Sequence, residues 1–225
     1  MIIPNEQWSF SSLKTFDQCP KKYYHIKIAQ DVVSTTGTAA LWGKQFHTAA
    51  ELYVCDSKKL PKEFQFAKDF LDVLIALKGI KFCELKMGAK LVDGKVDFCS
   101  FDDPDYWWHG IADFVNVNGT TAISIDYKTG KDRYADTTQL DAVAIGMFLN
   151  TPQLDKIKSA LAFVTTGKLV RKTHYRENLD LYISKFIPML EKLAATKKAG
   201  VWNPIAGPLC GWCPVTHCEH WEDRT

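Results

Sequence analysis

The sequence predicts an α/β fold in which a central mixed β-sheet is flanked by helices. Three observations lead to this prediction. Helical periodicity dominates the first third of the chain, a block of alternating strand-like segments follows, and a helix then precedes two further strands. The 225 residues, 46% of them hydrophobic, suit one domain with a substantial core.

The first elements are helices. Residues 9–28 begin with serines that can cap a helix, and Pro20 interrupts this segment, so a kink or a break is expected there. A second helix is expected at residues 39–55, after a Gly/Thr segment. A third is expected at residues 62–78, where apolar residues follow one stripe.

A strand-rich block comes next. The expected strands are residues 82–92, 95–101, 107–117 and 121–127, and the Asn118-Gly119 pair is a strong hairpin signal. The later elements are a helix at 137–148, strands at 159–165 and 168–175, and a long helix at 178–198 that contains Pro188. The expected single domain, residues 1–225, therefore has a helical part (1–80), a sheet core (81–175) and a helix with a cysteine-rich tail (176–225).

Charge and hydropathy limit the class of protein. The formal net charge of +2 neither demands nor excludes nucleic acid, because a basic groove can lie within a nearly neutral total. No apolar run reaches the ~18 residues that a membrane-spanning helix needs. The N-terminal stretch MIIPNEQWSF lacks the features of a signal peptide. We therefore expect a soluble cytoplasmic protein with no membrane partner.

Two carboxylates and one amine interrupt strands that otherwise look buried. Asp113 lies in one strand, and Asp126 and Lys128 lie in the next. Residues two apart in a strand face the same side, so Asp126 and Lys128 point together. Counting outward from the hairpin turn pairs Asp113 with Ser124, which makes Asp113 a diagonal neighbour of Asp126. The two carboxylates are therefore expected to share an ion.

This combination has a chemical reason. Two carboxylates at one point repel each other, and their burial is costly unless a cation neutralises them. Mg²⁺ or Mn²⁺ accepts such ligands. A lysine beside a metal-bound water can orient that water and stabilise charge that grows on a phosphate. A solvated surface hairpin is the alternative for D-x-K alone, but the neighbouring G-I-A-D, the hairpin and T-G-K make the combination more specific.

Residues 110–131, GIADFVNVNGTTAISIDYKTGK, resemble the catalytic core of the PD-(D/E)xK nuclease superfamily. The resemblance is to the branch of RecB-type and CRISPR-associated-type exonucleases, whose phage-encoded members often read G-I-x-D, then a hairpin, then D-Y-K-T-G-K. It extends over residues 9–218. It implies a restriction-endonuclease-like core and favours a phage-encoded protein.

The resemblance also assigns roles to residues. It implies that Asp113 and Asp126 bind two catalytic metal ions, that the carbonyl of Tyr127 joins them, and that Lys128 acts on the attacking water. Gln139 matches the family's glutamine on the next helix, which helps to place the DNA strand, although a glutamine there can also simply cover the helix surface. The family often has tyrosine four residues later, where this chain has Val143, a departure that affects a substrate contact and not the metal chemistry.

Two further residues are candidate ligands. A lone helical histidine is usually structural or exposed, but the family places G-x-x-x-H on an early helix, and Gly43 precedes His47 by four residues. The resemblance implies that His47 completes one metal site. Glu51, one turn later, either orients His47 or is a solvated helix charge. Glu84 on the first core strand is either a further metal ligand, as in several relatives, or an edge-strand charge.

The seven cysteines are unevenly placed. Scattered among apolar residues, and expected to be ordinary buried thiols, are Cys55, Cys83 and Cys99. The tail sequence CGWCPVTHC spaces Cys210, Cys213 and Cys218 as C-x2-C-x4-C, and in a reducing cytosol such crowding suggests a metal. Three thiolates need a fourth ligand, for which Cys19 is the candidate.

The resembled branch holds a [4Fe–4S] cluster with one N-terminal and three C-terminal cysteines. This implies that Cys19 and the three tail cysteines form a structural clasp that also helps to position DNA. Zinc is the competing metal, because His217 and His220 stand nearby and C-x2-C is common to both. Reduced free thiols in a tail are the third interpretation.

These observations predict a Mg²⁺- or Mn²⁺-dependent DNA exonuclease that hydrolyses phosphodiester bonds with two ions. Its substrate is a single strand or a duplex end, in recombination, repair or phage genome processing. A helicase, a recombinase or a single-strand-binding protein is the expected partner, in the bacterial host cytoplasm if the protein is phage-encoded. The alternatives are a catalytically idle nucleic-acid-binding subunit and a zinc-dependent DNA-binding protein. Idle relatives usually lose a metal ligand or the lysine, so the presence of Asp113, Asp126 and Lys128 favours the enzyme.

Overall fold

The computed structural model describes residues 2–33, 37–132 and 135–222. The chain forms two compact units. One comprises Gly37–Ile183 and contains the β-sheet, and the other comprises Met1–Thr36 together with Ser184–Thr225. Within the described ranges, no helix combines the length and the apolar character that are needed to cross a bilayer.

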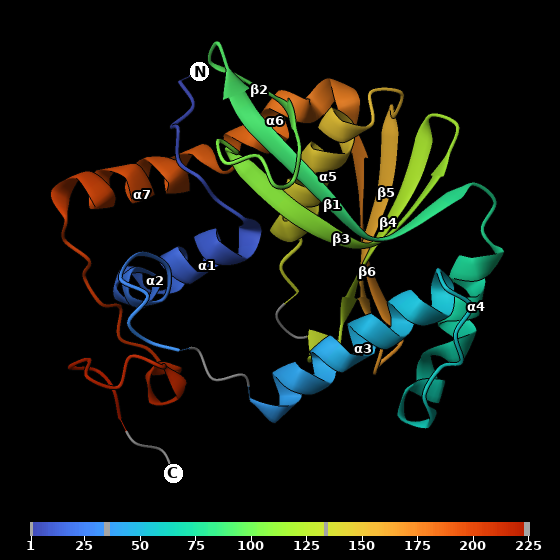
Figure 1. The fold of residues 1–225 in the computed structure, drawn as a ribbon, viewed down its shortest axis with the longest axis horizontal. Helices are drawn as coiled ribbons and strands as arrows, with labels where there is room; N and C mark the ends of the chain where they lie inside the picture. The colour runs from blue at the N-terminus through green and yellow to red at the C-terminus, as the bar shows by residue number, and fades with distance from the viewer. Residues whose placement is uncertain (1, 34–36, 133–134, 223–225) are drawn as a thin grey trace. The chain divides into compact units, whose positions relative to one another are not determined.

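Six strands form one mixed sheet in the order β2-β1-β3-β4-β5-β6 (Figure 1). β4 and β5 are parallel, and the other neighbouring pairs are antiparallel. The bounds are Ile80–Val92 for β1, Lys95–Cys99 for β2, Trp108–Asn118 for β3, Thr121–Lys128 for β4, Lys156–Phe163 for β5 and Lys168–Tyr175 for β6. The predicted α/β class with a central mixed sheet is confirmed.

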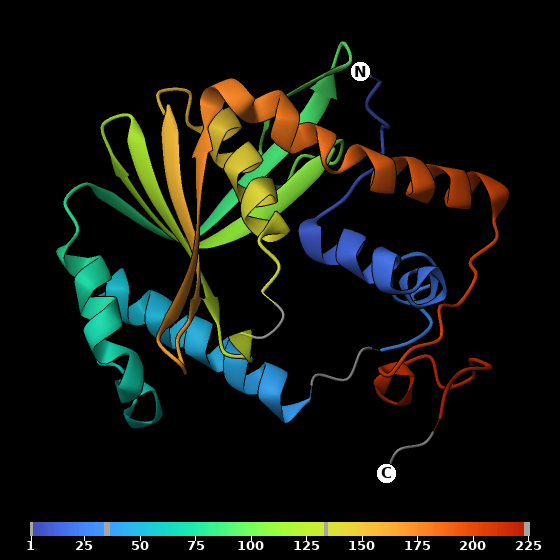
Figure 2. The ribbon, with the colours of Figure 1, turned by 180° about the vertical axis from the view of Figure 1, so that it is seen from behind.

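Helices cover both faces of this sheet. One face carries α3 (Thr38–Val54), the 3-10 helix η2 (Lys62–Ala67) and α4 (Lys68–Ala76), and the opposite face carries α5 (Thr138–Asn150), as Figure 2 shows. Alternate residues of β5 divide between the two layers. Ala160 and Ala162 belong to the core beneath α3 and α4, whereas Leu161 and Phe163 pack against Leu140 of α5.

Two expected helices are interrupted. Residues 62–78 begin as the 3-10 helix η2 before α4 starts. The long helix expected at residues 178–198 is preceded by the short 3-10 helix η4 (Arg176–Asn178) and divides into α6 (Leu179–Ser184) and α7 (Ile187–Ala199). Pro188 lies in the first turn of α7, where its missing N–H costs no helical hydrogen bond. The proline is therefore compatible with a new helix that begins at Ile187.

The second unit contains α1 (Phe10–Gln18), α2 (Pro20–Tyr23), the π-helix η1 (Tyr24–Ile28), α7 and the 3-10 helix η5 (Cys210–Trp212). Ser9 caps α1 in a reciprocal capping box with Ser12. The expected break at Pro20 is confirmed, because Cys19 ends α1 and its side chain caps α2. The unit consists of an N-terminal and a C-terminal segment of the chain. Trp8 of the first contacts Phe186 of the second, with ring centroids 4.6 Å apart.

Cys55 and Cys83 form a disulfide, with their Cα atoms 6.3 Å apart. The expectation that both are free thiols is therefore wrong. Cys55 is the C-cap of α3 and Cys83 lies in β1, so the fold brings together two residues that are 28 positions apart. Sequence spacing alone does not reveal this proximity. Cys99 is a buried free thiol, as expected.

Candidate active site

The candidate site lies where β3 and β4 separate. Their backbone pairing runs from the turn to Phe114 and Ile125, and no further pair between them is found in the described part of the chain. β3 continues beside β1, whereas β4 continues beside β5. The sheet therefore forks at Asp113 and Asp126, which are the next residues along the two strands.

The β3–β4 register differs from the predicted one by two residues. The turn is one residue later than expected, with Gly119 at a φ of +61° in its first position. Val115 therefore pairs with Ser124, and extending this register places Asp113 opposite Asp126. The expected diagonal arrangement is wrong, and the two carboxylates approach each other across the strands instead.

Asp113 takes the place of a backbone partner at the fork. Its Oδ2 accepts the N–H of Tyr127 at 2.7 Å, and its Oδ1 lies 3.3 Å from Nδ1 of His47. The carboxylate thus satisfies an N–H that the separating strands leave unpaired. The Tyr127 ring belongs to the core beneath α3, where burial raises the pKa of the phenol. The backbone of Tyr127 is therefore its candidate contribution to the site.

Asp126, Lys128 and Gln139 form a closed set of polar contacts. Lys128 Nζ lies 2.6 Å from Asp126 Oδ2 and donates to Gln139 Oε1 at 2.8 Å. The amide nitrogen of Gln139 in turn donates to Asp126 Oδ1. Alternate positions of β4 supply the first two residues, and the first turn of α5 supplies the third. This arrangement fixes the ammonium group beside the buried carboxylate.

The charge of Asp126 is incompletely compensated. Its side chain is almost fully buried, with 7% of the residue exposed. Burial and the negative charge of Asp113 raise the pKa of Asp126 to about 6, although Lys128 opposes this effect. A bound cation would favour the ionised carboxylate and so reverse the change. The surroundings of Asp126 therefore suit a positive ion.

His47, Glu84 and Asp113 each offer one ligand atom within 4.8 Å of the others. A Cβ at Gly43 would lie 2.8 Å from Oγ1 of Thr129, so the glycine lets α3 approach the end of β4 closely. His47 follows one turn later on the same helix. The G-x-x-x-H spacing thus combines a close helix approach with an imidazole at the fork.

The electrostatics of these groups favour a cation. Burial lowers the pKa of His47, but the hydrogen bond and charge of Asp113, with the charges of Asp126 and Glu84, raise it above its ordinary value. Burial and the charge of Asp113 also raise the pKa of Glu84. Asp113 contributes to both shifts, and a metal ion bound beside it would offset its negative charge.

Glu84 has an unusual backbone for a strand residue. Its φ is +49°, in the left-handed region that residues with a side chain rarely adopt. Its neighbours in β1 pair regularly with β3, so Glu84 lies opposite Asp113 in that register. Cys83, directly before it, is bonded to the end of α3. Pairing on both sides and a covalent link hold this strained conformation beside the ligand cluster.

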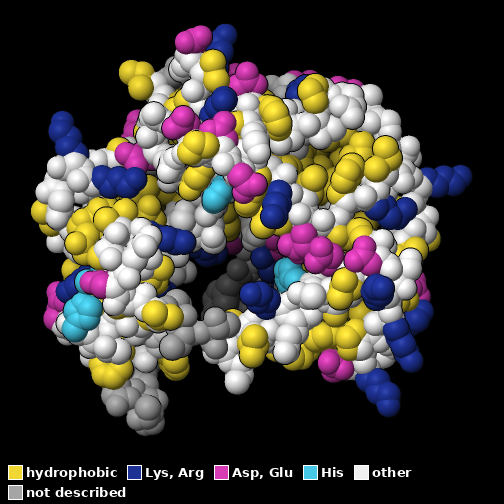
Figure 3. Space-filling model, viewed as in Figure 1, with side chains coloured by type: hydrophobic (Ala, Val, Ile, Leu, Met, Phe, Trp, Pro, Cys, Tyr) yellow, Lys and Arg dark blue, Asp and Glu magenta, His cyan; other side chains and the backbone are white. Residues whose placement is uncertain are grey.

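These groups line one open cleft of about 560 Å³. Figure 3 shows acidic side chains gathered beside a histidine on this face. The cleft brings together every residue that the sequence analysis assigned to the catalytic site: His47, Glu84, Asp113, Asp126, Tyr127, Lys128 and Gln139.

Some residues of the cleft did not stand out in the sequence. Lys44 and Thr48 of α3 line it, and so does Glu51, for which a solvated position was one interpretation. Lys44 and Glu51 lie three residues before and four residues after His47. Helical spacing already made Glu51 a candidate partner of His47, and the same spacing could have placed Lys44 on that side of α3.

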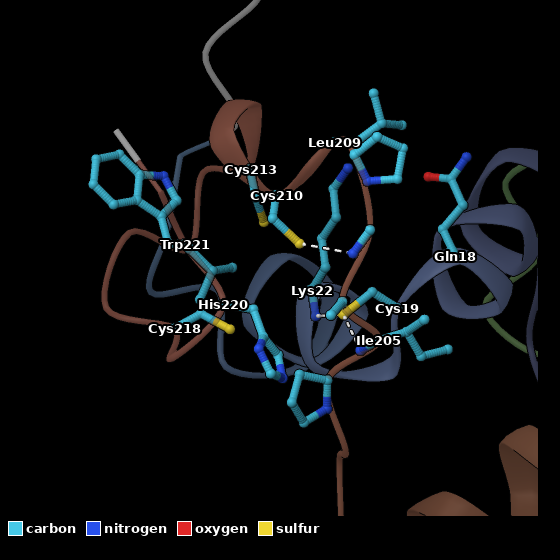
Figure 4. Close-up of a pocket in the computed structure, with 15 residues that line it drawn as sticks. Gln18, Cys19, Lys22, Ile205, Leu209, Cys210, Cys213, Cys218, His220 and Trp221 are labelled. Atoms are coloured by element: carbon cyan, nitrogen blue, oxygen red, sulfur yellow. Dashed lines mark hydrogen bonds between the residues drawn. The ribbon is translucent and has the colours of Figure 1, made fainter. Parts of the chain in front are cut away.

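In the other unit, a second pocket of about 200 Å³ contains the remaining candidate ligands. Figure 4 shows the cysteines entering it from the α1–α2 junction, from η5 and from the C-terminal segment. The pocket lining includes His220 and the four cysteines that the sequence analysis grouped: Cys19, Cys210, Cys213 and Cys218.

Backbone N–H groups contact two of these sulfur atoms. Cys19 Sγ accepts from Lys22 and from Ile205, each at 3.5 Å, and Cys210 Sγ accepts from Gly207 at 3.3 Å. In the described residues of this pocket, no three ligand atoms lie within 4.8 Å of one another.

Comparison with known proteins adds the family. A model described as the PD-(D/E)XK nuclease superfamily matches residues 7–218. A crystal structure from Eubacterium rectale, of a protein named for an inferred exonuclease activity, is similar with a TM-score of 0.51 and 17% identity, over 93% of this chain and 87% of that one. The protein SSO0001 is similar with a TM-score of 0.49 and 13% identity, over 97% of this chain and 88% of that one. No curated protein sequence matches.

Proposed function

This chain belongs to the PD-(D/E)XK nuclease superfamily, and from that membership we propose that it is a divalent-metal-dependent deoxyribonuclease. The observation that carries the proposal is the forked sheet, where Asp113 and Asp126 meet Lys128 and the His47–Glu84 pair in an open cleft. Exonuclease action is proposed in preference to endonuclease action. Its support is the resemblance to the exonuclease branch and the name of the Eubacterium rectale protein.

The donor set fits Mg²⁺ or Mn²⁺. Carboxylate oxygens and an imidazole are ligands that Mn²⁺ accepts readily, and Mg²⁺ favours the oxygens. Burial, together with the charge of Asp113, raises the pKa of Asp126, and a bound cation would favour its ionised form. We assign two ions to this cleft, and the residues that would hold them are His47, Glu84, Asp113, Asp126 and the Tyr127 carbonyl.

When bound, the ions supply charge stabilisation at the phosphate and a water of lowered pKa. The chain itself contributes position. Asp126 and Gln139 hold the Lys128 ammonium at the mouth of the fork, where it orients the attacking water and offers positive charge to the phosphate. Gln139 also presents its amide to the DNA strand. The left-handed backbone at Glu84 aims its carboxylate at the same point as His47 and Asp113.

For the second pocket we propose a [4Fe–4S] cluster held by Cys19, Cys210, Cys213 and Cys218. Four thiolates bound to one zinc at 2.3 Å would stand about 3.8 Å apart. No three of the ligand atoms here lie within 4.8 Å of one another in the described residues, and the support for a cluster is the resemblance to the branch that holds one with this cysteine set. Its proposed role is structural, because it would join the N-terminal and C-terminal segments of one unit, and the resemblance adds a part in positioning DNA.

The proposed substrate is a DNA single strand or a duplex end. The proposed setting is recombination, repair or phage genome processing in the cytoplasm, with a helicase, a recombinase or a single-strand-binding protein as partner. The resemblance of residues 9–218 to phage-encoded exonucleases supports this setting. Membership of a nuclease superfamily supports DNA as the substrate.

The test is digestion of end-labelled oligonucleotides with Mg²⁺ or Mn²⁺. We expect the native protein to release short products, and Asp126→Ala or Lys128→Ala to lower the rate by about 10³-fold, because each removes charge from the reaction centre. Asp97→Ala removes an exposed carboxylate of β2 and serves as the matched control, with the native rate expected. Native protein that binds DNA and leaves it intact would instead identify an idle binding module.

A further inference from the structure

A second groove runs along α3. Its floor includes the apolar residues Leu41, Leu52 and Phe64. Leu41, Lys44, Gln45, Thr48 and Leu52 are spaced three or four residues apart on α3, so they form one stripe of the helix. Residues 58–64 line the other side of the groove. They belong to the connection between the end of α3 and α4, which can be followed in Figure 1.

This groove adjoins the active-site cleft. Lys44 and Thr48 line both, so they form a shared rim between them. His47 lies on the neighbouring stripe of the same helix and faces the cleft. One turn of α3 therefore presents a metal ligand on one side and the groove on the other.

The charge of the groove is opposite to that of the cleft. Lys44, Lys58 and Lys59 line it, against the single acidic residue Glu63. In the described ranges, the ammonium groups of these three lysines have no ion pair or hydrogen bond with the chain. Figure 3 shows Lys and Arg side chains gathered at the lower right, over α3 and α4. Three unpaired cations are thus available to an external anion.

The floor between these lysines is open to solvent. Leu41 is 48% exposed and Leu52 is 38% exposed, although both are large apolar residues on a helix. A lysine-rich helix surface alone would be an ordinary solvated face. Here, however, the lysines flank exposed apolar side chains beside an acidic candidate metal cleft. This arrangement is complementary to a strand of nucleic acid, whose phosphates attract cations and whose bases pack on apolar side chains.

We propose that this groove binds single-stranded DNA and holds the part of the strand next to the phosphate that is cleaved. The lysines contact phosphates, and Leu41 and Leu52 contact unpaired bases. A duplex presents phosphates but keeps its base faces stacked, so the apolar floor selects a single strand. This inference rests on the proposed nuclease function and adds the strand form and its path.

The test measures binding of a labelled oligothymidylate by fluorescence anisotropy over a range of KCl concentrations, with EDTA to prevent cleavage. Lys58→Gln with Lys59→Gln is the groove variant. Lys95→Gln with Lys158→Gln, two exposed lysines of β2 and β5, is the matched control. The groove variant is expected to bind about tenfold more weakly, and its log K against log salt slope should fall by about 1.4, because each lost phosphate contact removes about 0.7.

A second variant separates base contacts from charge. Leu41→Ser is expected to weaken binding of the single strand by about fivefold at an unchanged salt slope, because a base contact releases no counterions. Equal affinity of the groove variant and the control would overturn the groove while digestion by native protein upheld the nuclease function. A duplex that binds as tightly as the single strand would overturn the choice of strand. Native protein that neither binds nor digests DNA would overturn both proposals.

Discussion

The two proposed metal centres are built in opposite ways. In the cleft, the ligands come from regular strands and helices, and protein groups already hold them: Tyr127 N–H on Asp113, and Lys128 with Gln139 on Asp126. In the cysteine pocket, the ligands come from a helix junction, a three-residue turn and an irregular tail. A folded sheet can thus hold candidate ligands in place without a metal, whereas we expect the cysteine pocket, in which Cys19 and Cys210 accept backbone N–H groups, to depend more on its metal.

Removal of the proposed cluster should have the largest effect on stability, and it tests whether the two centres differ in their need for a metal. Cys213→Ser is expected to abolish the visible iron–sulfur absorption and to unfold the unit of residues 1–36 and 184–225, because structural metals contribute about 10 kcal/mol or more. The sheet unit should keep its own unfolding transition in calorimetry. Iron and zinc analysis of native protein identifies the metal. A variant that retains both transitions would show that the pocket, like the cleft, forms without its metal.

The disulfide is the next largest contribution. Cys55→Ser with Cys83→Ser is expected to lower the free energy of unfolding of the sheet unit by about 3.5 kcal/mol, because the bond closes a loop of 28 residues. Urea denaturation measures this loss. Reductant should lower the stability of native protein to the level of the variant and leave the variant unchanged. Insensitivity of native protein to reductant would contradict the expected contribution.

The stability of metal-free protein should depend on pH, because the cleft holds buried carboxylates without a cation. Because the pKa of Asp126 is about 6 in the fold and 3.8 ordinarily, its contribution to stability is complete below about pH 4 and is lost as the pH rises through 6. The loss is on the order of 3 kcal/mol. The raised pKa values of His47 and Glu84 act in the same direction.

Urea unfolding in EDTA at pH 5 and pH 8 measures this effect. Asp126→Asn, which cannot ionise, should remove its share of the difference, and Mn²⁺ added to native protein at pH 8 should restore stability. A stability that is the same at both pH values would mean that the carboxylates are not crowded as described.

The smallest effect concerns the contact that positions Lys128. Gln139→Ala is expected to lower kcat by about tenfold, which corresponds to one lost hydrogen bond of about 1.4 kcal/mol. Gln153→Ala, an exposed glutamine in the loop before β5, is the matched control. An unchanged kcat for Gln139→Ala would separate this glutamine from the reaction and leave it a structural role in α5.

Much of the cleft could be predicted from the sequence because its candidate ligands occupy short-range patterns. Strand alternation and a hairpin signal bring Asp113 towards Asp126, and the spacing from Gly43 to His47 places an imidazole one helical turn from a close contact. These patterns remain informative even when the turn is displaced by one residue. The register error changed which residues pair and left the two carboxylates side by side.

The features that escaped prediction depend on distant contacts. The Cys55–Cys83 bond joins a helix end to a strand across 28 residues, and no local pattern marks the two as neighbours. The left-handed backbone at Glu84 occurs where β1 pairs with β3 on either side of it, and no local sequence pattern marks that position. The groove along α3 needs a wall from residues 58–64 that only tertiary folding supplies.

The fork in the sheet also has a mechanical consequence. The two acidic strands belong to different blades, β2-β1-β3 and β4-β5-β6, which share five residue pairs near the turn and part beyond them. Because the two strands pair only near the turn, a small bend there moves their separated ends by a larger distance. Ions bound between Asp113 and Asp126 would hold the separated ends together. Metal binding should therefore slow amide hydrogen exchange along β3 and β4 well beyond the residues proposed as ligands.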